Sequence, residues 1–250
     1  MSPLLFTALL LTTPQPVPPG PPPDVPDEEV VRRLDELFAR RDAPDAAAEL
    51  DALTRVPLKR QPPHFDVLWR VARHRFWISE TETWERRRMY MGQEIWDLSE
   101  KAIAQKPHRV EGHYFACLGV GISARGIGML NALRKGMDPK FRERLQRAIQ
   151  LDPTFWEGAP MLTEGRYHFE TPWPIRNLAK SAEVLRKAVA QYPKNVRARY
   201  YLAETLLEDG KKAEAKAELE KVVAEPGTDP IDARRVHSWA KLLLVKANAP

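Results

Sequence analysis

The chain has a single cysteine, Cys117, among its 250 residues. Without a second thiol, neither an intrachain disulfide nor a cluster of thiolate metal ligands can form. Cys117 follows small and apolar residues, which favours a small buried side chain. The six histidines are scattered, and none forms the helical pair with a nearby glutamate that a zinc site requires. We therefore expect no structural metal and no cofactor.

The sequence also has no apolar run at its N-terminus that is long enough to cross a bilayer. Residues 4–11 are apolar apart from one threonine, whereas a membrane-spanning helix needs about 20 such residues. The run resembles the core of a secretory signal peptide, although no basic segment precedes it and no small-residue cleavage site follows it. Residues 1–13 therefore indicate export, to the periplasm or a similar compartment. A mis-assigned start codon or a frayed tail, and with it a cytoplasmic location, is the alternative.

Residues 14–26 are rich in proline. Proline fixes φ and removes amide donors, so this stretch should be an extended, solvated spacer. The sequence thus divides into a signal-like segment (1–13), a linker (14–26) and a folded domain (27–248).

Basic residues exceed acidic ones only modestly, 39 against 34, which gives a net charge of +5 and a pI near 9.3. Arginines occur in short clusters spread along the chain, such as Arg40–Arg41 and Arg234–Arg235. A nucleic-acid site usually concentrates its charge on one face. We interpret these clusters as solvated helix faces and expect no nucleic-acid partner.

No stretch alternates apolar and polar residues over the length of a strand, so a β-sheet is not expected. Apolar residues instead recur at helical spacing, and Asp27 is expected to cap the first helix. The pattern predicts helices at residues 28–41, 44–55, 65–79 and 82–106.

A repeated pattern covers the rest of the chain. An alanine is followed five residues later by a proline at Pro107, Pro153 and Pro193, each time at the end of an amphipathic run. The alanine lets two helices approach closely, and the proline ends the helix. Shortly after each proline, aromatic and small residues begin the first helix of a new hairpin.

The spacing of these prolines identifies the repeat. Pro193 and Pro226 are 33 residues apart, close to the roughly 34 residues of a tetratricopeptide repeat (TPR). The preceding steps, 46 and 40 residues, are longer, so the middle repeats carry insertions. The sequence therefore predicts an all-α, TPR-like superhelix of antiparallel helix hairpins with insertions in the middle repeats.

Several stretches resemble a known family. They are His113 to Leu133, Leu151–Asp152–Pro153, the Pro172–Trp173–Pro174 loop and Leu202 to Leu207. Together they resemble the TPR-containing T-component associated with TRAP transporters, and the related TPR region of regulator-of-microtubule-dynamics proteins, over roughly residues 64–247.

The resemblance implies an extracytoplasmic, non-catalytic helical protein that handles a small organic ligand together with a solute-binding partner protein, and it leaves a homo-oligomer open. Two departures matter. No cysteine follows the apolar run at residues 4–11, which excludes a lipid anchor there, and the family's paired glycines are replaced by Gly158–Ala159–Pro160.

Four glycines, at positions 119, 121, 126 and 128, do not match the spacing of a phosphate-binding loop, and no strand precedes them. In a helix hairpin they either permit close backbone approach or break the helix before an insertion. The inserted stretch from Arg125 to Pro139 contains an apolar group, Ile127, Met129, Leu130 and Leu133. This group is either ordinary core or the wall of a ligand site or an oligomer contact.

The remaining candidates for binding a ligand or partner are aromatic and charged. Trp173 lies between two prolines on a stiff loop, where it either packs back or recognises a partner. Four further candidates lie on first helices of hairpins, which line the inner surface of TPR solenoids: Tyr114, Arg166, Tyr167 and His168. Together with Trp173, and with Arg125 and Leu130 of the inserted stretch, they make up the predicted site.

No serine, histidine and acid are placed to form a catalytic triad, so a hydrolase is disfavoured. The sequence predicts a non-enzymatic scaffold that binds a partner protein and a small organic solute, with membrane proximity through its N-terminus. A cytoplasmic TPR adaptor that docks peptide segments, attracted by the basic excess, is the alternative.

Overall fold

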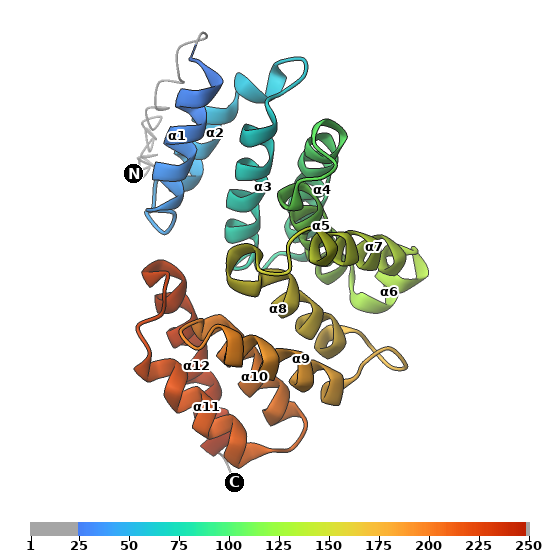
Figure 1. The fold of residues 1–250 in the computed structure, drawn as a ribbon, viewed down its shortest axis with the longest axis vertical. Helices are drawn as coiled ribbons and strands as arrows, with labels where there is room; N and C mark the ends of the chain where they lie inside the picture. Colours follow the sequence, from blue (N-terminus) through green and yellow to red (C-terminus); the bar gives the residue numbers. More distant parts are fainter. Residues whose placement is uncertain (1–24, 249–250) are drawn as a thin grey trace, which may run out of the picture.

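The computed structural model describes residues 25–248, so the signal-like segment 1–13 and most of the linker lie outside the described residues. All regular structure in this part of the chain is helical, which confirms the predicted all-α class (Figure 1). The helices are α1 (Asp27–Phe38), α2 (Ala46–Thr54), η1 (Pro57–Lys59), α3 (Phe65–Ser79), α4 (Glu85–Gln105), α5 (Val110–Ile127), α6 (Met129–Arg134), α7 (Met137–Leu151), α8 (Phe155–Glu170), α9 (Leu178–Gln191), α10 (Val196–Glu208), α11 (Lys212–Ala224) and α12 (Pro230–Asn248).

The three repeated prolines end helices as predicted. α4, α7 and α9 each stop two residues before Pro107, Pro153 or Pro193. The alanines of the same repeat, Ala102, Ala148 and Ala188, are completely buried because each lies where two helices touch. The small residue and the helix stop therefore recur as one structural unit.

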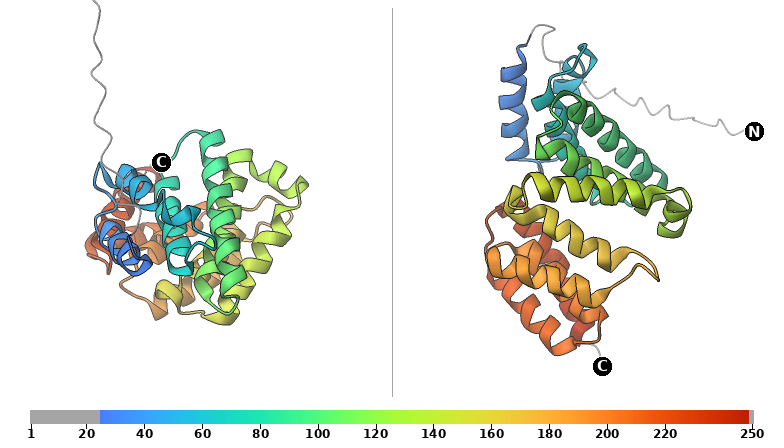
Figure 2. Two further views of the ribbon diagram at one scale, coloured as in Figure 1. Left: turned by 90° about the horizontal axis from the view of Figure 1, so that it is seen from above. Right: turned by 45° about the vertical axis from the view of Figure 1, so that its right-hand side comes forward.

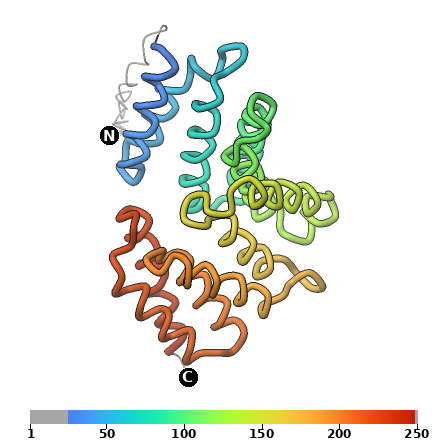
Figure 3. The backbone as a smooth tube through the Cα atoms, viewed as in Figure 1, coloured from blue at the N-terminus to red at the C-terminus, as the bar shows by residue number. Residues whose placement is uncertain are grey.

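Successive helices pack as antiparallel hairpins, α3 with α4, α5 with α7, α8 with α9 and α10 with α11. The tube in Figure 3 shows that this array curves, so that α12 returns towards α1 at the start of the chain. Ion pairs join these distant segments: Arg41 bonds Asp229, and Asp42 bonds Arg234. These ion pairs therefore join the start of α12 to the segment that follows α1.

The molecule has two lobes, each with apolar clusters of its own, and Ala159 at the start of the second lobe packs into the cluster of the first. The amino lobe, residues 27–151 (α1 to α7), contains one large apolar cluster around Phe65 and Phe115. The carboxy lobe, residues 159–248 (most of α8, and α9 to α12), contains three smaller clusters. Figure 2 shows α7 and α8 side by side where the lobes join.

The first helix differs from its prediction at both ends. Asp27 is the first helical residue and does not cap α1; Pro26 holds the capping position and Asp27 instead pairs with Arg60. The helix ends at Phe38 and not at residue 41. The helical spacing of apolar residues could not place this end, because a short series of turns follows directly.

Glycines of α5 bring its backbone against α4. A Cβ added to Gly119 would lie 2.7 Å from the Trp96 nitrogen, and one added to Gly126 would lie 2.5 Å from the Met89 nitrogen. α5 runs unbroken through both positions and stops at Gly128, whose φ of 84° only glycine adopts readily. Close approach, the first of the two interpretations above, is therefore the role of Gly119 and Gly126.

The first helix of the hairpin that follows Pro153 is interrupted near its start. Trp156, Glu157 and Gly158 all have left-handed backbone conformations, with φ of 47°, 55° and 75°. Right-handed helix resumes only after them. A Cβ at Gly158 would lie 2.5 Å from the Tyr192 ring, so this glycine is fixed by space as well as by φ. Helical periodicity cannot reveal such a turn.

No helix among residues 25–248 combines the length and apolarity of a membrane span.

Candidate functional site: a cavity between the two lobes

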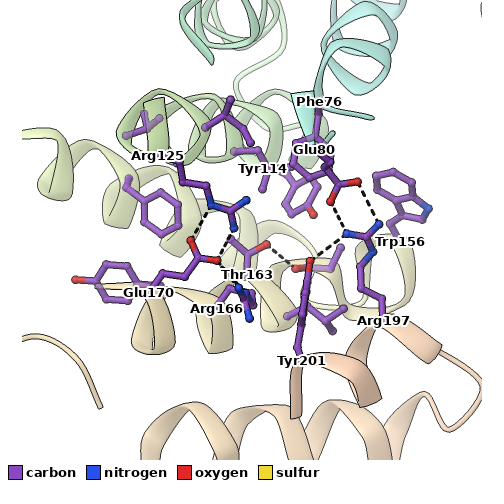
Figure 4. Close-up of a pocket in the computed structure, with 18 of the residues that line it drawn as sticks. Phe76, Glu80, Tyr114, Arg125, Trp156, Thr163, Arg166, Glu170, Arg197 and Tyr201 are labelled. Atoms are coloured by element: carbon purple, nitrogen blue, oxygen red, sulfur yellow. Dashed lines mark hydrogen bonds and ion pairs between the residues drawn. The ribbon is translucent and has the colours of Figure 1, made fainter. Parts of the chain in front are cut away.

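A cavity of about 380 Å³ lies between the amino and carboxy lobes. Its walls come from α3, α5, α6 and α7 on one side and from α8, α10 and the start of α12 on the other. Figure 4 shows the side chains of several of these helices converging on it. The first helices of the fold's hairpins, α5, α8 and α10, thus face a common space, as in a TPR solenoid.

One wall of the cavity is mainly apolar. Leu118 of α5, Leu133 of α6 and Phe141 of α7 line it. Phe141 stacks on Tyr167 of α8 with ring centroids 5.4 Å apart, and the Tyr167 hydroxyl donates to Asp138 at 2.7 Å. Aromatic packing thus joins the two lobes along this wall.

A carboxylate from α8 ties the lobes together at one end of the cavity. Glu170 accepts hydrogen bonds from Arg125 of α5 at 2.8 Å and from Arg166 at 2.7 Å (Figure 4). Arg166 precedes Glu170 by one helical turn and also pairs with Glu204 of α10. Burial alone would raise the pKa of Glu170, but the charges of Arg125 and Arg166 outweigh it and lower the pKa to about 2.

A second group of charges lies nearer α12. Arg197 of α10 binds both Glu80, which directly follows α3, and Asp232 of α12, and it donates to the Tyr201 hydroxyl at 3.0 Å. Arg235 adds a further bond to Glu80, at 3.0 Å. Burial by itself would lower the pKa of Arg197, but the neighbouring carboxylates, Glu80 first among them, hold it well above its usual range. Glu80 is therefore a buried link between the lobes.

The arginine clusters are not all solvated, which corrects the prediction from the sequence. Arg41 is 8% exposed, and its guanidinium lies 4.3 Å from the Phe38 ring centre and 4.4 Å from that of Trp77. Asp229 of the carboxy lobe pairs with it. Arg235 is similarly placed over Trp77. These arginines belong to the contact between the lobes, because the curvature of the array brings the start of α12, which carries Arg235, close to Arg41 and Trp77 of the amino lobe.

Four of the seven residues predicted to bind a ligand or partner line the cavity: Tyr114, Arg125, Arg166 and Tyr167. They come from α5 and α8, so the expectation that first helices face inward locates them together. Burial raises the pKa of Tyr114, which keeps its phenol protonated.

The other three lie outside the cavity lining. Leu130 is 60% exposed on α6, although its neighbours Met129 and Leu133 line the cavity. Trp173 is 86% exposed on the loop between α8 and α9. His168 lies on α8 beside Tyr167, half-buried, with ring centroids 5.3 Å apart. For Leu130 and His168 helical phase decides this, since adjacent residues of one helix face different directions.

Sequence reasoning did not assign several of the lining residues to the site. Trp156 and Glu157 are directed to the cavity by the left-handed turn. Arg41, Glu80 and Asp232 reach it from the two ends of the array. In the sequence, one signal pointed towards this region: Gly158–Ala159–Pro160 replaces the paired glycines of the resembling family.

Within the described range, no group of three or more His, Cys, Asp or Glu side chains is arranged to hold a metal ion. Among the lining residues, the charged groups are arginines and carboxylates that bond mainly to one another. This arrangement is suited to binding and orienting a ligand, and it places no nucleophile beside a general base.

The fold and the inward-facing cavity define a TPR-type helical-repeat protein. The family model described as "Regulator of microtubule dynamics protein 1-3" matches residues 30–248. Since this match covers most of the chain, the protein belongs to that family, which confirms the TPR-like resemblance seen in the sequence.

A solved structure supports the same fold. The chain is similar to TTC0263, a thermophilic TPR protein in Thermus thermophilus, with a TM-score of 0.63 and 20% sequence identity. The match covers 87% of this chain and 100% of that chain. No curated protein sequence matches significantly. The structural likeness establishes a TPR-like scaffold, a class that is typically non-catalytic.

Proposed function

We propose that this protein is a non-catalytic TPR scaffold that binds a small, largely apolar organic solute in the cavity between its lobes. The cavity itself carries the proposal. Its volume, about 380 Å³, lies in the usual range of small-molecule sites, roughly 300–1,000 Å³. Such sites combine an apolar lining with a few polar groups in fixed positions. Leu118, Leu133 and Phe141 supply the apolar lining. The ion pairs around Glu170 and Arg197 supply the fixed polar groups.

The ion pairs also favour binding over catalysis. Glu170 and Glu80 each bond two arginines, so the charges are oriented before a ligand arrives. Pre-organised walls reduce the entropic cost of binding. Groups held in such pairs have pKa values far from neutrality, which suits a fixed wall better than proton transfer.

A partner protein completes this proposal. TPR-type arrays usually present surfaces to other proteins, and Trp173 stands exposed on a loop beside α8. A solute-binding protein of a TRAP-like transporter is the partner that the family resemblance suggests, and the exposed loop would also allow a homo-oligomer. A cytoplasmic adaptor for peptide segments is the alternative.

Export from the cytoplasm is part of the same proposal. It rests on the apolar run at residues 4–11 and the proline-rich spacer that follows it. N-terminal sequencing of the native protein is expected to find a start within or after the linker, residues 14–26. Native protein that begins at residue 1 and fractionates with the cytosol would contradict export and favour the adaptor.

Filling the cavity tests solute binding. The probe is N-phenyl-1-naphthylamine, an uncharged aromatic molecule that fluoresces in apolar surroundings. Leu133 is half-buried and lines the cavity, so Leu133→Trp should occupy part of its volume. We expect this variant to bind the probe about tenfold more weakly than the unaltered protein, a loss of about 1.4 kcal/mol.

Leu130→Trp is the matched control. Leu130 lies on the same helix, is 60% exposed and is not among the lining residues, so its substitution should leave probe affinity unchanged. Circular dichroism and thermal midpoints would verify that both variants fold. If the unaltered protein failed to bind the probe, or bound it no better than Leu133→Trp, the cavity would not be the solute site.

A further inference from the structure

The cavity lining contains more negatively charged than positively charged side chains. Four arginines and six carboxylates line it, and no lysine or histidine does so among the described residues. Every one of these arginines already bonds a carboxylate of the protein: Arg41 with Asp229, Arg125 and Arg166 with Glu170, and Arg197 with Asp232. An anionic ligand would have to displace one of these built-in carboxylates.

One lining carboxylate has no cationic partner. Glu80 and Asp138 pair with arginines, as do the three carboxylates named above. Glu157 alone among the six forms no ion pair within residues 25–248, and its carboxylate accepts a hydrogen bond from the Thr228 hydroxyl at 2.8 Å. Thr228 therefore fixes the position of the Glu157 carboxylate without neutralising its charge.

The surroundings of Glu157 are those of a site for a cation. Trp156, the preceding residue, also lines the cavity, is 42% exposed and lies 6.0 Å from the Phe38 ring. At this same end, Asp229 follows Thr228 and binds Arg41, whose guanidinium lies over Phe38. The protein thus already holds one of its own cations between a carboxylate and aromatic rings here, and Glu157 supplies a second carboxylate.

The turn that carries Trp156 and Glu157 is held in place from both sides. Its left-handed φ values are unfavourable for residues with side chains. Asn195 donates to the Glu157 carbonyl at 3.3 Å, and Tyr192 packs against Gly158. The carboxy lobe therefore fixes both side chains at the cavity before a ligand binds.

We infer that the solute carries a protonated aliphatic amine, and that Glu157 binds this ammonium group beside the Trp156 ring while the apolar part lies along the wall of α5 and α6. This inference rests on the proposed function and specifies its ligand class. A carboxylate supplies a charge-assisted hydrogen bond, and an aromatic face adds a cation–π attraction. Acidic solutes, by contrast, meet a lining with more carboxylates than arginines.

The test uses three probes with the same alkyl chain: decylamine, decanol and decanoate. Each displaces N-phenyl-1-naphthylamine from the full-length protein near neutral pH, where the amine is cationic and the acid is anionic. We expect decylamine to bind about tenfold more tightly than decanol, and decanoate to bind more weakly than either.

Glu157→Gln removes the charge while its amide oxygen can still accept from Thr228. This variant should lose the tenfold preference for decylamine and retain its affinity for decanol. Glu164→Gln, on the same helix but outside the lining, is the matched control and should keep the preference. Thermal midpoints would confirm that both variants fold, and Trp156→Leu should weaken decylamine binding without affecting decanol.

The outcomes separate the two proposals. If none of the three probes displaces the fluorophore, solute binding in the cavity fails, and the amine inference with it. If all three bind equally, or if Glu157→Gln keeps the preference for decylamine, the cavity still binds apolar solutes but the amine inference is overturned.

Discussion

Glu170 shows how one side chain connects the two lobes. Its carboxylate accepts hydrogen bonds from Arg125 of the amino lobe and from Arg166 of its own helix. Only 19% of its side chain is exposed. Burial by itself raises the pKa of such a carboxylate and favours its protonated form. Two guanidinium groups reverse that effect and keep the charge on the oxygen atoms.

The stability of the fold should therefore depend on acid pH. The folded-state pKa of Glu170, about 2, lies below the ordinary value of 4.5, so its stabilisation is present above about pH 4.5 and is lost as pH falls towards 2. Linkage gives an upper limit of about 3 kcal/mol for this contribution. Urea unfolding at about pH 7 and about pH 3 would measure it.

Glu170→Gln should reduce this pH dependence and lower the stability at neutral pH. Glu183→Gln is the control, since Glu183 lies on the surface of α9 and pairs with Lys180 and Lys187 within the same helix. Equal slopes of stability against pH for Glu170→Gln and the unaltered protein would show that Glu170 does not make this contribution.

Individual site residues could be predicted where a helical phase was available. Arg166 and Tyr167 were found because α8 begins a hairpin, and both do line the cavity. Trp156 and Glu157 were not found, because three consecutive left-handed residues follow no helical period. Their direction depends on Asn195 and Tyr192, which are more than thirty residues away in the sequence.

At the scale of elements, the contact between α4 and α5 depends on glycine. Gly119 faces backbone atoms of α4, including the Trp96 nitrogen and the Gly92 oxygen, and leaves no room for a side chain. Gly121, two residues later on the same helix, has only the edge of the Phe141 ring nearby, at 3.4 Å. The two positions therefore differ in what they can accept.

Gly119→Ala and Gly121→Ala form a matched pair. The Cβ at position 119 would lie 2.7 Å from a backbone nitrogen, and we expect overpacking to cost about 1–3 kcal/mol. At position 121 the better helix propensity of alanine should make the change neutral or stabilising, by up to about 1 kcal/mol. Chemical denaturation of both variants would measure the difference. Similar stabilities would mean that α4 and α5 are not in backbone contact.

Most helices were predicted well because their signals are local. Apolar spacing identified α3 with the correct ends, and the alanine–proline pattern located the ends of α4, α7 and α9. The ends of α1 were less accurate. This helix begins at Asp27, after Pro26 in the capping position, and ends at Phe38 before a short series of turns, and helical periodicity marks neither end.

At the scale of the whole molecule, the lobes meet through separate groups of contacts around the cavity. One group consists of Glu80 with Arg197 and Arg235. Another consists of Phe141 stacked on Tyr167 and of Arg125 paired with Glu170. The cavity is what remains between these contacts, so its shape depends on the curvature of the whole array.

The charge of the cavity is likewise a property of the whole molecule. The chain carries a net charge of +5, yet carboxylates outnumber arginines in the lining. The basic excess of the sequence is compatible with acidic partners without requiring them. At the cavity the folded arrangement makes carboxylates the majority, because it places Glu80, Glu157 and Asp232, from three distant segments, around one space.

The sequence by itself determined the helical class, the repeat and the inward orientation of α5, α8 and α10, because side-chain periodicity and helix-ending prolines act over a few residues. Only the tertiary structure decided which charges meet, that Arg41 is buried while Arg235 lies over Trp77, and that Glu157 keeps an unpaired charge at the cavity. These features depend on the return of α12 to α1, and small rotations between successive helix pairs accumulate to produce that return. No local pattern of residues encodes the total of these rotations.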